Sequence, residues 1–147
     1  MLAQDINVNI GGGIFGSCLH LAVVKLDIWI VNSLINKKAD LDKPDVDGNT
    51  ALHLVMNVFA KDSAKCAYIS ELLCKNKANV NMKNNENWAP IHNAVRKGNE
   101  KVIECILKIN LMLSQMGMEQ FDLDQNGGAN GWTALHLAAF NGHIGVV

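Results

Sequence analysis

The chain has 147 residues, a net charge of −1 and a hydrophobic fraction of 49%. This length allows one domain with a sizeable core, and the hydrophobic fraction is too high for a disordered chain. The near-zero charge gives no global field that would recruit nucleic acid. The first ten residues lack the layout of a secretory signal, and no apolar run approaches the roughly 20 residues of a membrane span. We therefore expect an intracellular, cytoplasmic protein that binds no nucleic acid and does not insert into a membrane.

The first notable segment is INVNIGGGIFGSCLHLAV, residues 6–23, which has the spacing G-x-G-x-x-G over residues 11–16. In a dinucleotide-binding fold such a loop links a strand to a helix and holds pyrophosphate. That fold also needs a second buried strand about 20 residues later that ends in an acidic residue. Residues 32–45 contain Asp40 but lack the Val/Ile run of a buried parallel strand. We interpret the glycines as part of a hairpin and keep a nucleotide-binding enzyme as a remote alternative.

The chain then repeats one histidine-centred pattern. The copies read GSCLHLAV, NTALHLVM, APIHNAV and WTALHLAA, and their histidines are His20, His53, His92 and His136. An NVN or DLD motif lies 13 residues before each of the first three histidines and 14 residues before the fourth. Successive histidines are 33, 39 and 44 residues apart, so the second and third copies contain extra residues. We place these residues near 60–66 and mainly in 109–121, the latter between a second helix and the next hairpin.

Each copy carries the start signal of a short helix. Ser17, Thr50 and Thr133 stand where a hydroxyl caps the free amides of a helix N-terminus. The third copy has Ala89 at this position, followed by Pro90 in the first turn, where its missing N–H costs nothing.

Turn and stop signals also recur. Gly48 and Gly131 fit a tight hairpin turn, and Asn87, which tolerates positive φ, takes this place in the third copy. Gly98 follows a first helix, where a left-handed residue ends it, whereas the first copy has Leu26 there. We expect a hairpin and a helix pair in each copy.

These residues resemble the ankyrin repeat, whose pattern is roughly D-x-x-G-x-T-P-L-H-x-A-A followed by G-H, V-V, L-L and A-D-V-N. The resemblance covers nearly the whole chain and is most specific in residues 45–55 and 130–147. It implies an all-α repeat solenoid, an ankyrin-type stack in which each unit is a hairpin followed by two antiparallel helices. We expect a single domain over 1–147, a fragment of a longer protein, with a truncated last unit; the units are about 7–39, 40–78, 79–121 and 122–147.

The same resemblance gives the repeated histidine a structural role, in which it bridges backbone groups of adjacent hairpins. Metal binding by these histidines is excluded by distance, because packed helices lie about 8–10 Å apart and zinc ligands about 2.1 Å from the ion. The cysteines contain no C-x-x-C pair, and we expect reduced thiols that pack as small apolar side chains, at Cys18, Cys66, Cys74 and Cys105. We predict no catalytic residue, metal or cofactor, and no enzyme activity.

Ankyrin repeats usually bind other proteins through the concave face formed by hairpin tips and first helices. The variable positions of the family fall on Val46, Asp47, Asn49, Asn85, Glu86, Trp88, Asn93, Arg96, Lys97, Asn130, Trp132, Leu137, Phe140 and Asn141. Trp88, Trp132 and Arg96 are residue types that dominate binding hot spots. An aromatic side chain at this position can instead pack only on the neighbouring hairpin. Both readings stay open, as does the choice between a contact surface and a lengthened helix for residues 109–121.

The resemblance implies a protein-binding module, an adaptor or scaffold that acts as a monomer. The partner is another protein or another part of the parent chain. In the second case the repeats would form the regulatory array of a larger enzyme or channel.

Overall fold

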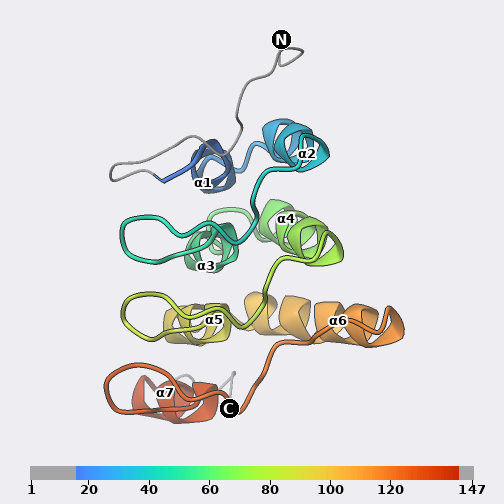
Figure 1. Ribbon diagram of the computed structural model, residues 1–147. Helices are drawn as coiled ribbons and strands as arrows, with labels where there is room; N and C mark the ends of the chain where they lie inside the picture. The colour runs from blue at the N-terminus through green and yellow to red at the C-terminus, as the bar shows by residue number, and fades with distance from the viewer. Residues whose placement is uncertain (1–15, 143–147) are drawn as a thin grey trace.

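The computed structural model describes residues 16–142, and this part of the chain consists of α-helices and loops. An isolated antiparallel bridge pairs Gly127 with Trp132. The helices are stacked in pairs, one pair above the next (Figure 1). This arrangement confirms the predicted all-α repeat solenoid. Of the glycine pattern, Gly11, Gly12 and Gly13 lie outside the described residues, and Gly16 has a φ of 68°. The segment after the first helix forms a second helix where a dinucleotide-binding fold requires a strand.

The helices form two columns. In chain order they are α1 (Cys18–Val24), α2 (Ile28–Asn36), α3 (Ala51–Asn57), α4 (Ser63–Lys75), α5 (Pro90–Lys97), α6 (Glu100–Gln115) and α7 (Ala134–Phe140). The inner helices α1, α3, α5 and α7 pack on one another in succession, and the outer helices α2, α4 and α6 form the second column (Figure 1). None of the helices within residues 16–142 combines the length and the apolar character needed to cross a membrane.

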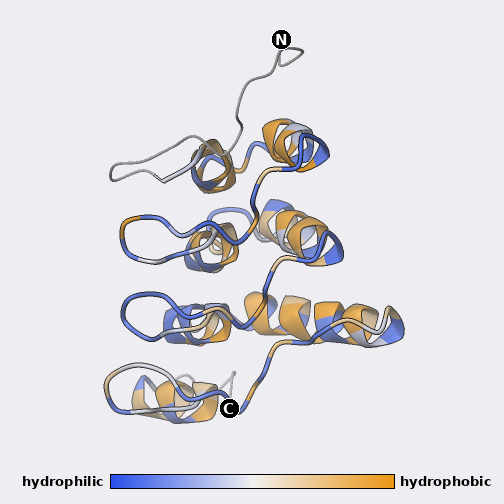
Figure 2. Ribbon diagram, in the orientation of Figure 1, coloured by the Kyte–Doolittle hydropathy of each residue, from blue (hydrophilic) through white to orange (hydrophobic). Residues whose placement is uncertain are grey.

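Hairpin loops project from the inner column, and backbone hydrogen bonds close them at their bases. These hairpin loops are residues 45–49, 84–88 and 127–132, closed by N–H···O bonds of 2.9, 2.9 and 2.8 Å. The turn residues Gly48, Asn87 and Gly131 have φ values of 78°, 64° and 63°, which confirms the predicted turn positions. The loops are mostly hydrophilic, and the helices carry most of the hydrophobic residues (Figure 2).

Every inner helix in the described residues begins with the same hydrogen bond. The backbone N–H of the capping residue donates to Nδ1 of the histidine three residues later, at 3.0 Å from Ser17 and 3.1 Å from Thr50. Ala89 makes this bond too, at 3.1 Å, although it has no hydroxyl to cap the helix. Ser17, Thr50 and Thr133 stand at the predicted N-terminal positions, but of their hydroxyls only that of Thr133 accepts a helix amide, the N–H of His136 at 3.4 Å. The bond to the histidine needs only the backbone of the capping residue.

Several helices are followed by a residue in the left-handed conformation, and only some of these residues are glycine. Gly98 ends α5 with φ 68°, as predicted, and Leu26 takes the same conformation after α1 with φ 55°. Lys38 and Lys77 follow the outer helices α2 and α4 with φ values of 63° and 70°. A non-glycine residue in this region is strained by about 1 kcal/mol.

The extra residues of the longer units are mostly helical. The outer helix has 9 residues in α2, 13 in α4 and 16 in α6. The prediction that residues 109–121 lie between the outer helix and the next hairpin is wrong for 109–115, which form the last turns of α6. Ile109 and Leu113 continue the buried stripe of α6, and this periodic burial extends the helix. Of the two readings left open, the lengthened helix is confirmed.

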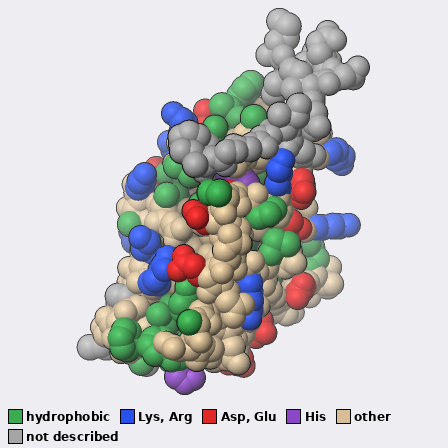
Figure 3. Space-filling model, turned by 60° about the vertical axis from the view of Figure 1, so that its left-hand side comes forward, with side chains coloured by type: hydrophobic (Ala, Val, Ile, Leu, Met, Phe, Trp, Pro, Cys, Tyr) green, Lys and Arg blue, Asp and Glu red, His purple; other side chains and the backbone are tan. Residues whose placement is uncertain are grey.

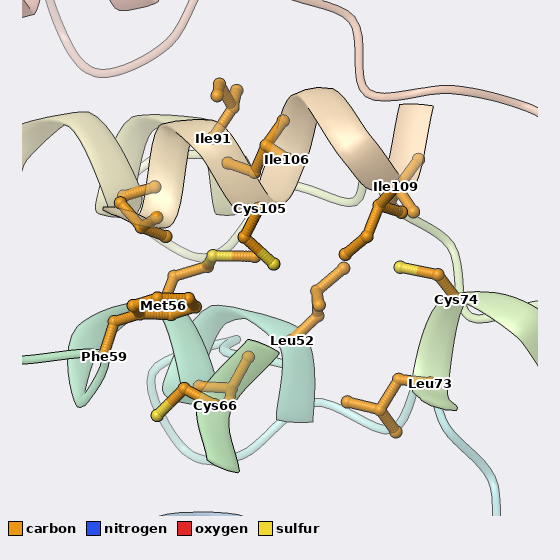
Figure 4. Close-up of a cluster of buried hydrophobic side chains, with 14 of the residues drawn as sticks. Leu52, Met56, Phe59, Cys66, Leu73, Cys74, Ile91, Cys105, Ile106 and Ile109 are labelled. Carbon is orange, nitrogen blue, oxygen red and sulfur yellow. The ribbon is translucent and has the colours of Figure 1, made fainter. Parts of the chain in front are cut away.

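The core runs continuously between the two columns. Figure 4 shows Met56 of α3 directed toward Cys105 of α6, and Leu52 of α3 directed toward Ile109 of α6. The thiols of Cys66, Cys74 and Cys105 are free and buried, and burial raises their pKa values to about 11, 12 and 11. They pack as small apolar side chains, as predicted, whereas Cys18 is exposed.

We expect Lys77→Gly to raise the free energy of unfolding by about 0.5–1 kcal/mol. Glycine adopts this φ without steric strain, and its larger entropy in the unfolded chain offsets part of the gain. Urea unfolding followed by circular dichroism measures the difference. Leu26→Gly is the control, because Leu26 packs against the core and its removal loses apolar burial. An unchanged or lower stability of Lys77→Gly would contradict the strain at this position.

Candidate functional site

The histidines join each unit to the next. Nε2 of His20 donates to the backbone oxygen of Asn49 at 2.9 Å, and Nε2 of His53 donates to that of Trp88 at 2.9 Å. Nε2 of His92 lies 2.9 Å from the oxygen of Gln125 and 3.2 Å from that of Trp132. These bonds confirm the bridging role that the resemblance implies.

The hydrogen bonds also define the protonation state of the rings. Nδ1 accepts a backbone N–H, which can only donate, so Nδ1 carries no proton and the proton is on Nε2. His53 and His92 are 0% and 1% exposed. Burial lowers their pKa values below the ordinary 6.5, and hydrogen bonds to backbone groups offset only part of this effect. Both rings are therefore neutral at pH 7.

The hairpin tips are also bonded to one another. The backbone N–H of Asn85 donates to the oxygen of Asp47 at 3.0 Å, and its side-chain amide donates to the oxygen of Val46 at 3.0 Å. The N–H of Gly128 donates to the oxygen of Asn87 at 3.0 Å. Because these bonds fix each tip against the next, the exposed side chains of the tips hold a defined spacing.

Most of the predicted contact residues lie on the surface. The exposed residues are Val46, Asp47, Asn85, Glu86, Arg96, Lys97, Asn130, Phe140 and Asn141. Seen from the hairpin side, this surface carries both signs of charge with hydrophobic side chains between them (Figure 3). Asn49, Trp88 and Trp132 are half-buried. Asn49 is held by the framework, because its Oδ1 accepts the side-chain amide of Asn84 at 2.8 Å.

Trp88 supports the neighbouring hairpin. Its ring lies 5.1 Å from that of His92, and its six-membered ring faces the Cα of Gly128 so closely that a Cβ there would lie 2.5 Å from two ring atoms. Trp132 lies 4.9 Å from the ring of Phe140 on α7. Trp88 therefore takes part in packing between units, and a role of either tryptophan in binding stays a prediction.

Two predicted contact residues need correction because they are buried. Asn93 is 2% exposed and Leu137 is 5% exposed. Both follow the repeated histidine directly, on α5 and α7, which pack against each other. The sequence pattern identifies a variable position there, but the close packing of the inner helices covers these two side chains.

A hollow that sequence reasoning missed lies on the opposite column, between α4 and α6. It has a volume of about 380 Å³, with Phe59, Ala67 and Cys105 in its apolar lining and Glu71 and Lys101 among its charged residues. No sequence motif marks this hollow, because it arises where two helices from different units meet. Within residues 16–142 no group of His, Cys, Asp and Glu side chains is arranged to hold a metal ion.

We expect the stability to fall as the pH is lowered below about 6.5. The unfolded state binds protons at His53 and His92 more tightly than the folded state does, so acid favours unfolding by up to about 1.4 kcal/mol per pH unit for each histidine. Above about pH 7 these residues are neutral in both states and the stability is constant. Urea unfolding between about pH 5.5 and about pH 7.5 measures the slope. A flat stability profile across this pH range would contradict the lowered pKa values of His53 and His92.

We expect Asn93→Leu to stabilise the protein by about 1 kcal/mol. Oδ1 of Asn93 is buried and has no hydrogen-bond partner within the described residues. The other copies carry leucine at this position, as Leu21, Leu54 and Leu137. The matched control is Asn110→Leu, which should destabilise, because Oδ1 of Asn110 accepts the N–H of Phe121 at 2.9 Å. Thermal unfolding compares the two variants, and a destabilised Asn93→Leu would show that Asn93 has a partner that the structure lacks.

Comparison with known proteins agrees with this geometry. A family model described as ankyrin repeats (3 copies) matches residues 19–115 and 63–147. A putative ankyrin repeat protein of Rickettsia felis is 33% identical over 105 residues, which cover 67% of this chain and 45% of that protein. The human ankyrin repeat domain-containing protein 13C is 31% identical over 110 residues, covering 71% of this chain and 19% of that protein.

A third relative is the probable 26S proteasome regulatory subunit p28 of Saccharomyces cerevisiae, which is 30% identical over 126 residues. The match covers 84% of this chain and 48% of that protein. The chain thus spans less than half the length of these relatives. The family model covers far more than half of the chain, and the structure has the stacked helix pairs, the hairpin loops and the bridging histidines that the repeat implies. The chain belongs to the ankyrin repeat family.

Proposed function

We propose that this chain is a protein-binding module, and that its contact surface consists of the hairpin tips and the exposed side of the inner helices. One observation carries the proposal: the repeated histidine is constant, whereas the residues at the hairpin tips and at the fourth position after the histidine differ between units. The bridging histidine is the same in every unit. Six residues before it, on the exposed tips, stand Asp47, Glu86 and Asn130. Four residues after it, on the inner helices, stand the exposed Val24, Arg96 and Phe140 and the half-buried Asn57.

This pattern suits recognition of a folded or extended protein partner. The bridged hairpins form a rigid surface that loses little conformational entropy on binding. Phe140 is 74% exposed although it is large and apolar, and it pairs with Trp132 at one end of the surface. Arg96 holds the equivalent position on α5 and is also exposed. Aromatic and arginine side chains contribute most strongly to binding when a partner covers them.

The relatives support binding without identifying the partner. One of them is named as a regulatory subunit of the 26S proteasome, a component of a larger assembly. Because the relatives extend well beyond the matched region, a second candidate is that the repeats bind another part of their own parent chain. The same surface would serve both functions.

The test compares two pairs of exposed residues. Arg96→Ala/Phe140→Ala alters the proposed surface, and Trp29→Ala/Leu107→Ala alters the outer helices, where the two side chains are 74% and 54% exposed. A partner protein captured by the unmutated chain is purified, and its Kd for each folded variant is measured by calorimetry. We expect each anchor to contribute about 2 kcal/mol, so the first pair weakens binding by roughly 1,000-fold and the second by less than about threefold.

If Trp29→Ala/Leu107→Ala weakens binding and Arg96→Ala/Phe140→Ala does not, the contact surface lies on the outer helices and the proposal is rejected. Equal weakening by both pairs would also reject it, because the surface would then not be confined to the inner column. If the only partner found is a segment of the parent chain, the regulatory function is favoured over an adaptor. Trp88→Ala is unsuitable for this test, because loss of the ring would also disturb the hairpin at Gly128.

A further inference from the structure

We propose that Asn130 is a site of spontaneous deamidation, and that the fold directs this reaction to Asn130 in preference to other Asn–Gly sequences of the chain. In deamidation the backbone nitrogen of the following residue attacks the side-chain amide carbon of asparagine. The amide nitrogen leaves as ammonia, and a cyclic imide remains. Water then opens the imide to aspartate or isoaspartate. No oxidant, metal or cofactor takes part, so the chain and water contain all the reactants.

The sequence offers this chemistry at three places. Asn–Gly pairs occur at residues 126–127, 130–131 and 141–142, all near the end of the chain. Glycine favours ring closure because it has no Cβ to obstruct the attacking nitrogen. All three pairs have this advantage, so the sequence does not rank them. The ranking follows from how tightly the fold holds each attacking nitrogen.

The fold protects Asn126. The N–H of Gly127, which would have to attack, donates to the backbone oxygen of Trp132 at 2.8 Å, and the oxygen of Gly127 accepts the N–H of Trp132 at 2.9 Å. Gly127 also packs against His92, since a Cβ there would lie 2.7 Å from the imidazole. Ring closure at Asn126 therefore requires the base of the hairpin to open and to move away from the bridging histidine.

Asn141 is held at the end of a helix. It is the C-terminal capping residue of α7 with φ −83° and ψ −1°, and its N–H donates to the oxygen of Leu137 at 3.1 Å. The N–H of Gly142 donates to the oxygen of Ala139 at 3.2 Å. The attacking nitrogen becomes available only when the last turn of α7 unwinds.

Asn130 lacks these constraints. It lies at the tip of a hairpin loop and is exposed, as is Gly131. The N–H of Gly131 makes a long turn contact of 3.4 Å to the oxygen of Gly128, and nothing lies within 4 Å of where a Cβ on Gly131 would be. No hydrogen bond holds the Asn130 side chain in the part of the chain that the structure describes. Both reacting groups can therefore approach each other without disturbing a neighbouring unit.

The reaction would change the charge pattern of the surface. Asn130 stands six residues before its histidine, in the place that Asp47 and Glu86 occupy on the preceding tips. Deamidation adds one negative charge and gives three successive tips an acidic residue. The modification itself is independent of the proposed binding function, and only its effect on a partner rests on that function.

The experiment follows each asparagine by peptide mapping, in which deamidation adds about 1 Da to the peptide. The full chain is incubated at mildly alkaline pH, once folded and once unfolded in urea. In urea we expect the three Asn–Gly pairs to react at similar rates. In the folded chain Asn130 should keep its rate, while Asn126 slows by at least about fivefold, the factor that one hydrogen bond of ordinary net strength imposes.

Equal protection of Asn130 and Asn126 in the folded chain would overturn the proposal, and so would faster reaction at Asn126 or Asn141. Ammonia release gives a second readout with conservative variants. Asn130→Gln should remove most of the early release from the folded chain, whereas Asn126→Gln should leave it unchanged. If both variants release ammonia at the rate of the unmutated chain, deamidation occurs at another residue and the proposal is wrong. Neither failure bears on the proposed binding function, which is tested through other residues.

Discussion

The neutral imidazole that links one unit to the next is the interaction on which the rest of the structure depends. Its Nδ1 accepts the N–H that begins its own helix, and its Nε2 donates to a carbonyl of the following hairpin. One ring therefore forms hydrogen bonds with a backbone N–H of its own unit and a backbone carbonyl of the next. An unpaired backbone group buried at this interface would cost about 1–3 kcal/mol. Each unit in turn relies on its neighbour, so the stability of the stack arises from interfaces between adjacent layers.

Because of these bonds, some positions of the repeat carry the same residue in successive units, whereas other positions vary between units. The repeated histidine recurs in a buried environment in three layers, at His20, His53 and His92. The residues at the hairpin tips and at the fourth position after the histidine vary in chemistry between units. The separation is incomplete, because Trp88 supports the hairpin around Gly128 and Asn85 bonds to the tip before it. These two residues belong to the surface and to the framework together, which is why the contribution of residues such as Phe140 is easier to isolate.

Much of the fold could be predicted from the sequence, because the signals are local and repeated. The spacing of the histidines, the capping residues and the turn residue Asn87 each depend on a few neighbouring positions. Other features could not be predicted, because they depend on residues in another unit. These are the burial of Asn93 and Leu137, the packing of Trp88 and the hollow between α4 and α6. The left-handed Lys77 was also missed, because a lysine gives no local signal for positive φ.

The protonation pattern of the histidines shows whether a neutral imidazole links one unit to the next. Nitrogen-detected NMR of the imidazole rings distinguishes the Nε2–H tautomer, the Nδ1–H tautomer and the charged form. At neutral pH we expect the Nε2–H tautomer for His20, His53 and His92, because Nδ1 of each ring accepts a backbone N–H. The Nδ1 signal should be that of an unprotonated acceptor. His53 and His92 should stay neutral as the pH falls to 6.5, the ordinary pKa of histidine, since burial lowers their pKa values below it. An Nδ1–H tautomer at these three rings, or a charged ring at His53 or His92 at neutral pH, would contradict the bridging role of a neutral imidazole.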